Sequence, residues 1–224
     1  MNSLSIKIGF WSAFLFTLAS AAYGAAAGIF FSLYPIPSWS GIYAYASFMS
    51  STPQNLFSFC QVLAFLSGLL FIPLLCSIHD FAQEEKKILA KIGICFGVVF
   101  VVLSSMCYFI QFTIVPQNIL SGQINGLEHF VELNTKSFIA AITVLGWGLF
   151  FGLTTLFIAP VFSGGKRENV IRWSFIITGI FCILNTLGFM LQNIMLSIAS
   201  TLIFNSSVLI ACISLCMLFK RLKK

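Results

Sequence analysis

The sequence predicts an all-α fold, a single bundle of six transmembrane helices, and three observations support this fold class. Hydrophobic residues make up 59% of the 224 residues and charged residues only 8%, whereas a soluble globular domain carries about 25% charged residues. The apolar residues gather in six long runs, and the basic residues gather in alternate connections. A water-exposed surface needs more charge than this, so we expect a membrane protein with one domain, residues 1–224.

Six segments are long enough to cross a membrane as helices, because the hydrocarbon core requires about 20 apolar residues. Backbone polar groups in lipid must be hydrogen-bonded within their own segment, which makes helices the expected structure. The expected spans are residues 6–33, 56–78, 90–115, 137–162, 170–191 and 194–219.

The first segment has a second interpretation, as a cleaved signal peptide, because "WSAFLFTLASAAYGAAAG" combines a short apolar core with A-x-A-like sites. Cleavage would leave five spans. The apolar run continues through "IFFSLY", which is long for a signal core and favours an uncleaved span. Gly24 and Gly28 form a G-x-x-x-G step here, and small residues at that spacing let helices approach closely. They are our candidates for a helix–helix association face.

Basic residues set the predicted orientation. All of the 12 lysines and arginines except Lys136 fall on one side of a six-span bundle. They lie near the N-terminus, in the second and fourth connections, in the C-terminal tail, or, for Lys91 and Arg172, just inside the span that follows a connection. Cytoplasmic connections carry an excess of lysine and arginine. We therefore expect a multi-pass protein of the cell membrane with both termini in the cytoplasm, and an even number of spans agrees with that.

The C-terminal tail "KRLKK", residues 220–224, directly follows the last apolar run. Each basic residue next to an anionic leaflet contributes about 1 kcal/mol of membrane attraction. We expect the tail to lie on anionic lipid at the cytoplasmic face of the bilayer. We expect no nucleic-acid binding, because four basic residues held at the bilayer are too few to follow a phosphate backbone.

The second outer connection contains "GLEHFVELNTK", residues 126–136, with Glu128, His129 and Glu132. Leu120, Ile124, Leu127 and Val131 recur at helical spacing, which predicts a short amphipathic surface helix that places the two glutamates on one face. We interpret them as a solvated face. The alternative is an outer acid/base or metal site, but a metal needs three or four ligands and no further histidine or acid exists on this side, so no metal is expected.

Ionisable residues are missing from the middle of every expected span. Such residues normally mark proton relays and ion pathways, so their absence argues against a proton-coupled pump. His79 and His129 fall on opposite sides of the membrane, which excludes haem held by paired histidines. Neither H-E-x-x-H nor G-x-S-x-G occurs. The seven cysteines form no C-x-x-C pair and are expected to be free thiols. No cofactor is predicted.

Neutral polar residues remain as the candidate binding groups within the spans. Converging amides and a phenol would line a small outward-facing pocket. The alternative is hydrogen bonding between helices, which contributes about 0.6 kcal/mol per bond on average. The candidates are Gln61, Tyr108, Gln111, Asn185 and Asn205.

Three runs in the latter half of the chain resemble uncharacterised bacterial multi-span integral membrane proteins: "YFIQFTIVPQ" (108–117), "LGWGLFFGLTTLFIAPVFSGG" (145–165) and "IRWSFIITGIFCILNTLGF" (171–189). The resemblance implies the membrane fold and carries no catalytic residue, cofactor or partner with it. The leading hypothesis for function is a non-enzymatic protein that binds or passes a small neutral or lipidic molecule. The alternatives are a membrane enzyme using Glu128, His129 and Glu132, and a structural or regulatory membrane subunit.

Overall fold

The structure, a computed structural model, describes residues 2–35 and 38–223. Within these residues the chain forms helices joined by connections, without a strand. Six of the helical segments are long and apolar enough to cross a membrane. The predicted all-α fold with six transmembrane helices is therefore confirmed, and the chain is a multi-pass membrane protein.

Four of the spanning segments are single helices, and two are made of consecutive helical segments. The single helices are α1 (Ser3–Leu33), α3 (Gln54–Phe81), α8 (Lys166–Met190) and α9 (Ile194–Leu222). The third span joins α4 (Lys87–Phe112) to the short α5 (Ile114–Leu120). The fourth joins α6 (Phe138–Val144), the π-helical turn η3 (Leu145–Phe150) and α7 (Phe151–Ile158). The third span begins with the 3₁₀ turn η1 (Glu84–Lys86), and the fourth ends with the 3₁₀ turn η4 (Ala159–Val161). Outside the spans lie α2 (Ile42–Ser51) and the 3₁₀ turn η2 (Leu127–His129).

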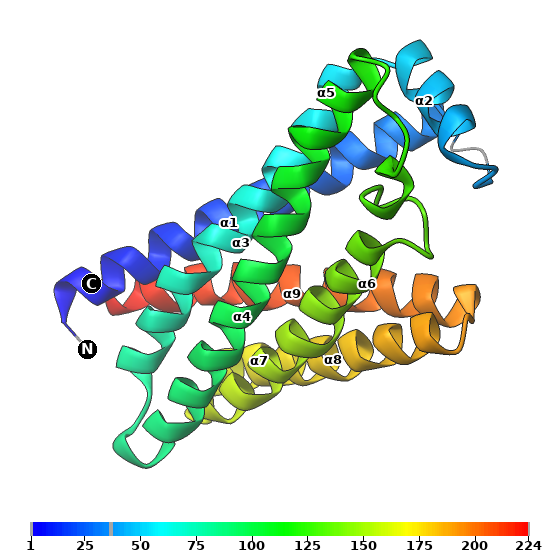
Figure 1. The fold of residues 1–224 in the computed structure, drawn as a ribbon. Helices are drawn as coiled ribbons and strands as arrows, with labels where there is room; N and C mark the ends of the chain where they lie inside the picture. Colours follow the sequence, from blue (N-terminus) through cyan, green and yellow to red (C-terminus); the bar gives the residue numbers. More distant parts are fainter. Residues whose placement is uncertain (1, 36–37, 224) are drawn as a thin grey trace.

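The bundle has two different ends. The start of α1 and the end of α9 lie together (Figure 1), and a Cβ added at Gly9 would lie 2.7 Å from the Phe219 ring. We call this the basic end, since it holds the N-terminal segment, the 82–86 and 162–165 connections and the C-terminal tail. The opposite end, with the 34–53, 121–137 and 191–193 connections, is the loop end. Toward the loop end, α1, α3 and α4 spread away from α8 and α9 (Figure 1).

Two clusters of buried apolar residues pack the helices together. The larger cluster joins α1, α3, α4, α7, α8 and α9 through fully buried rings such as Phe71, Phe100 and Phe151. The smaller cluster lies at the loop end, where Tyr45 of α2 packs together with Phe57 and Val131. The two connections that were expected on the outer side therefore fold onto the ends of α1, α3 and α5.

Close helix packing does not occur at the G-x-x-x-G step that the sequence singled out. A Cβ added at Gly24 or Gly28 would meet nothing within 4 Å among the described residues. The tight approaches lie elsewhere: a Cβ at Gly93 would lie 2.5 Å from Ile158, and one at Gly148 would overlap Oγ1 of Thr186. Gly24 and Gly28 thus take no part in packing within the described chain, and their use as a face for another molecule stays a prediction.

The amphipathic helix expected around residues 120–131 is not formed, and this prediction was wrong. Leu127 and Val131 are buried as the pattern suggested, but Gly122 and Gly126 have positive φ angles of 70° and 81°. That left-handed conformation interrupts a helix. The segment instead makes turns and the single 3₁₀ turn η2, so Glu128 and Glu132 do not share a helix face.

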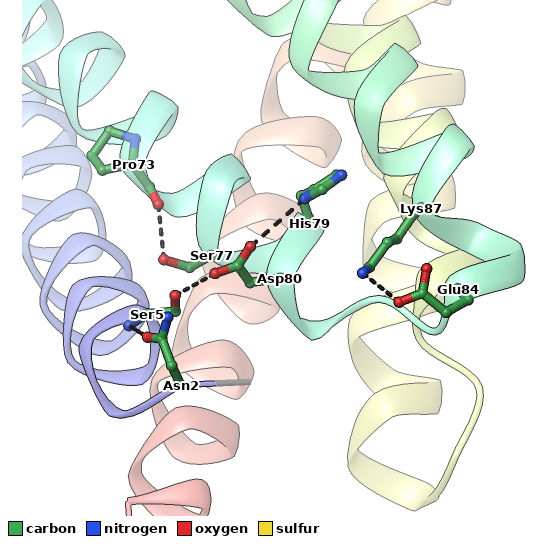
Figure 2. Close-up of polar contacts among 8 residues, drawn as sticks. All are labelled: Asn2, Ser5, Pro73, Ser77, His79, Asp80, Glu84 and Lys87. Atoms are coloured by element: carbon green, nitrogen blue, oxygen red, sulfur yellow. Dashed lines mark hydrogen bonds and ion pairs between the residues drawn. The ribbon is translucent and has the colours of Figure 1, made fainter.

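Polar contacts join the helix ends at the basic end (Figure 2). The Ser5 hydroxyl at the start of α1 donates to the carboxylate of Asp80 near the end of α3. Nδ1 of His79 lies 3.7 Å from the same carboxylate, and Nζ of Lys87 lies 2.5 Å from the Glu84 carboxylate. Asp80 and Glu84 therefore each have a polar or cationic partner.

Candidate functional site

A cavity of about 190 Å³ lies between α1, α3 and α4 on one side and α6, η3, α8 and α9 on the other. Its apolar lining comes from Phe16, Ala64, Val144, Phe204 and Val208. Its polar lining comes from Ser20, Tyr23, Ser67, Tyr108, Thr143, Trp147, Asn185, Thr201 and Asn205. None of these side chains is charged, so the cavity suits a molecule with both apolar and uncharged polar parts.

Helical spacing explains why these residues meet. In α1 the lining residues Phe16, Ser20 and Tyr23 are four and three positions apart, which places them on one face of the helix. Ala64 and Ser67 of α3 are also three apart. The same rule aligns the lining residues of α9. Small hydroxyl residues on these faces leave the space that a leucine or phenylalanine would have filled.

Trp147 lies on the π-helical turn η3 and lines the cavity. π-Helical turns are rare and frequently occur at functional sites. The indole packs edge-on against Phe100 with ring centres 4.6 Å apart, and its ring centre lies 6.5 Å from that of Tyr108. Nε1 of Trp147 and Oγ1 of Thr143 are buried and have no hydrogen-bond partner among the residues that the structure describes. Each therefore offers an unused polar group next to the cavity.

The five neutral polar residues that the sequence singled out fall into two groups. Tyr108, Asn185 and Asn205 line the cavity. Asn185 also accepts a 3.4 Å hydrogen bond from the Thr201 hydroxyl, so it joins α8 to α9. Asn205 belongs to an exposed part of α9 and donates to the Thr201 carbonyl oxygen at 2.8 Å. All three residues line the cavity, but only Asn185 also makes a hydrogen bond between helices, because the Asn205 bond lies within α9.

Gln61 and Gln111 form the second group and bind the 121–137 connection. Nε2 of Gln111 donates to the Phe130 carbonyl oxygen at 2.5 Å, and Oε1 of Gln111 accepts from the Glu132 N–H at 3.2 Å. Nε2 of Gln61 donates to Oε2 of Glu132 at 3.4 Å. Gln61 is three residues from Ala64, and Gln111 is three residues from Tyr108. Both glutamines therefore lie one helical turn beyond the cavity lining, toward the loop end.

Glu132 is the carboxylate that these contacts draw into the bundle. It is partly buried, and no lysine, arginine or histidine lies within ion-pair distance of it in the part of the chain that the structure describes. Burial raises the pKa of Glu132 to about 7, although the hydrogen bond from Gln61 acts in the opposite direction. Loss of hydration penalises the charged form, and no neighbouring cation offsets that penalty.

Glu128 and His129 have other contacts. Nε2 of His129 lies 3.9 Å from Oε1 of Glu128, and the histidine side chain is 67% exposed. The Glu128 backbone oxygen accepts from Nδ2 of Asn134 at 2.8 Å. Within residues 2–35 and 38–223, no group of three histidine, cysteine, aspartate or glutamate residues is arranged to hold a metal ion. The sequence-predicted trio is thus divided: Glu128 pairs with His129, while Glu132 contacts the two glutamines.

Sequence reasoning missed Tyr23 and Trp147 as lining residues and missed the inward position of Glu132. The glycines on both sides of Trp147 were a usable signal, because Gly146 and Gly148 let this turn pack closely on its neighbours. Comparisons with protein-family models, with curated proteins and with solved structures found no match to this chain. A proposal for function must accordingly be based on the cavity and on the contacts of Glu132.

Proposed function

We propose that this protein binds a small neutral or lipid-like molecule in the cavity between its two groups of helices, and that it acts as a binding or transport protein without catalysing a reaction. The observation that carries the proposal is a cavity of about 190 Å³ with mixed apolar and uncharged polar lining. An apolar cavity of about 150 Å³ is large enough for a benzene molecule. The space beside Trp147 therefore suits a compact ligand or part of a lipid chain.

Two lining groups support an amphipathic ligand. Nε1 of Trp147 and Oγ1 of Thr143 lack partners within the described chain, and a buried polar group without a partner costs about 1–3 kcal/mol. A ligand oxygen or nitrogen that accepts from the indole N–H would remove that cost. Asn205 lines the cavity from an exposed position on α9. An amide facing lipid is unfavourable, which supports an opening of the cavity toward the bilayer beside Asn205.

The enzyme alternative has weaker support. It requires Glu128, His129 and Glu132 to act on one substrate, and their contacts divide them between two sets of partners. We likewise propose that the protein resides in the cell membrane with both termini in the cytoplasm, because the lysines and arginines gather at the basic end. Labelling of single cysteines introduced near Ser121 and Lys166 tests this orientation; both labelled from the same side would contradict it.

Tryptophan fluorescence tests the binding proposal. The chain has four tryptophans, and replacing Trp11, Trp39 and Trp173 by phenylalanine leaves Trp147 as the reporter. In lipid nanodiscs, titration with n-hexanol should give a saturable change in Trp147 emission. A matched protein that retains only Trp173, which is 57% exposed, should show only the gradual change expected from partitioning into lipid.

A cavity-filling variant provides the control. Ala64→Leu in the Trp147-only protein adds three carbon atoms to a buried lining position and should abolish the saturable response. A saturable response that survives this substitution, or no saturable response in the parent, would contradict the proposal. Native mass spectrometry adds a separate readout: a stable protein partner without any retained small molecule would favour the structural-subunit alternative.

A further inference from the structure

Glu132 differs from the acids of the basic end in the partners that it has. Asp80 accepts from Ser5, and Glu84 pairs with Lys87. Glu168 accepts from the backbone N–H groups of Ser163 and Gly164 at 3.1 and 2.8 Å. Glu132 is held inside the loop end and its carboxylate receives one 3.4 Å hydrogen bond, from an uncharged amide. A carboxylate removed from water in this way is costly unless a cation reaches it.

Two buried acceptors next to this carboxylate also lack a donor. Oε1 of Gln61 and the hydroxyl of Tyr45 have no hydrogen-bond partner among the described residues, and the two side chains are only 6% and 5% exposed. The Gln61 amide is the same group whose Nε2 contacts Glu132. The Tyr45 hydroxyl is close enough that, after burial, the charge of Glu132 is the second cause that raises its pKa. The site thus offers three acceptors and needs N–H donors.

The cavity adjoins this group of acceptors. Gln61 and Gln111 lie one turn from the lining residues Ala64 and Tyr108. Tyr23 and Tyr108 both line the cavity and both lie within the electrostatic reach of the Glu132 carboxylate. Aromatic faces attract cations, more strongly where water is excluded. Since the lining holds no charged residue, Glu132 is the charge that a ligand in this cavity would meet at the loop end.

We propose that the ligand of this cavity carries a protonated amine, with Glu132 and Oε1 of Gln61 accepting hydrogen bonds from its N–H groups and with its hydrocarbon part lying beside Tyr23 and Tyr108. This inference rests on the proposed binding function and specifies the class of molecule bound. An ammonium group supplies three N–H donors, which matches the unused acceptors, and it neutralises the buried carboxylate. A neutral alcohol supplies one donor and no charge.

The proposal predicts how binding depends on pH. The titratable groups that lie within the electrostatic reach of Glu132 are Tyr23 on α1, Tyr45 on α2, and Cys107 and Tyr108 on α4. None of them carries a positive charge in either protonation state. An alkylamine has a pKa of about 10 and stays protonated below pH 9, whereas the pKa of Glu132 is about 7 without ligand. Amine affinity should therefore rise with pH through about 7 and level off above it.

Hexylammonium, n-hexanol and hexanoate are matched probes for the experiment, which uses the full-length Trp147-only protein in nanodiscs of zwitterionic lipid. At pH 8, hexylammonium should bind about tenfold more tightly than n-hexanol, because charge-assisted hydrogen bonds replace neutral ones. Hexanoate should bind most weakly. In Glu132→Gln the advantage of the amine should vanish while n-hexanol still binds, which also shows that the variant is folded. Glu128→Gln, the same change in the same connection, should keep the advantage.

The outcomes separate the two proposals. Equal binding of hexylammonium and n-hexanol to the parent protein would overturn the ammonium inference and leave the binding function standing. No saturable binding of either probe would overturn both. An equal loss in Glu128→Gln and Glu132→Gln would overturn the inference in favour of general attraction to an acidic surface. If Glu132→Gln does not fold, the parent decides: an amine-to-alcohol affinity ratio that does not change between pH 6 and pH 8 contradicts the proposal.

Discussion

Three carboxylates at the basic end and the Glu132 carboxylate at the loop end differ in their exposure and in their hydrogen-bond partners. At the basic end, Asp80, Glu84 and Glu168 are close to water and are matched by hydroxyl, ammonium or backbone N–H groups. At the loop end, the Glu132 carboxylate accepts one hydrogen bond, from the Gln61 amide, and the Glu132 N–H donates to the Gln111 amide oxygen. Packing also differs between two glycine positions, since helices meet closely around Gly93, whereas a Cβ at Gly28 would meet nothing within 4 Å among the described residues. The comparison sets acids that have polar or cationic partners against a partly buried acid without a cation, at the end where we propose that the ligand's charge lies.

The packing contrast predicts the largest effect. Gly93→Leu would place side-chain atoms against Ile158 and the Thr154 carbonyl oxygen, and overpacking of a tight contact costs about 1–3 kcal/mol or more. Gly28→Leu enters open space and replaces glycine by a better helix former. Thermal unfolding in detergent should show a large loss of stability for the first variant and little change for the second. Similar losses of thermal stability in both variants would contradict the packing contrast between Gly93 and Gly28.

The carboxylate contrast predicts a pH effect on stability. In the folded protein the pKa of Glu132 is raised from its ordinary value of 4.5 to about 7, so the folded protein holds this proton more strongly than the unfolded chain. Its stabilising contribution is complete below pH 4.5 and is lost as pH rises to about 7. Allowing for partial exposure, we expect a loss of about 1–2 kcal/mol between pH 5 and pH 8.

Thermal unfolding across this pH range checks the effect, with two variants as comparison. Glu132→Gln should flatten the dependence of stability on pH. Glu84→Gln, which removes an exposed acid paired with Lys87 at the basic end, should leave it unchanged. A parent protein that gains stability from pH 5 to pH 8 would show that Glu132 is stabilised as a carboxylate, contrary to the proposed lack of a cation.

The inward position of Glu132 depends on Gln111. Gln111→Leu removes the partners of the Phe130 carbonyl oxygen and the Glu132 N–H, which should cost about 1–2 kcal/mol. Hydrogen exchange should speed up in residues 121–137 and remain slow in the spans. Gln117→Leu on the exposed side of α5 is the matched control and should change neither the stability of the protein nor the hydrogen exchange of residues 121–137. Unchanged exchange in the Gln111 variant would mean that apolar packing alone holds this connection.

The basic tail predicts the smallest effect on the fold. Replacing the four basic residues of "KRLKK" by glutamine should weaken retention of anionic lipid during purification, at about 1 kcal/mol for each residue. Thermal stability should not change, because Lys220 and Arg221 are exposed; Lys224 lies outside the described residues. Lipid mass spectrometry measures the outcome, and an unchanged content of anionic lipid would leave the tail with an orienting role alone.

Composition predicted the fold class because lipid imposes a local rule, namely that about 20 consecutive apolar residues form a spanning helix. The candidate site depends on contacts between distant segments and was less accessible. The spacing of Leu127 and Val131 predicted burial of that face correctly and predicted its helix wrongly, since Gly122 and Gly126 turn the chain. That turn carries Glu132 inward, which local periodicity cannot show.

The two G-x-x-x-G pairs also show that residue spacing alone does not predict contacts between distant segments. Gly24–Gly28 and Gly93–Gly97 have identical spacing, and of these two pairs only the second lies against another described helix, where a Cβ at Gly97 would overlap the Leu75 side chain. Residue spacing fixes which side chains share a face, and the rest of the chain decides what that face meets. Tyr108 and Gln111 illustrate this point as well: they are one turn apart on α4, but one lines the cavity and the other binds the loop.

Infrared difference spectroscopy of Glu132 tests the central claim most directly, because it observes the proton that the ligand would displace. At pH 6 the Glu132 carboxyl should be largely protonated, given its pKa of about 7. Adding hexylammonium should remove the band of a buried carboxylic acid and produce a carboxylate band. Neither change should occur when n-hexanol is added to the parent protein, or when hexylammonium is added to the Glu132→Gln variant. A protonated Glu132 that keeps its band while hexylammonium occupies the cavity would contradict the account.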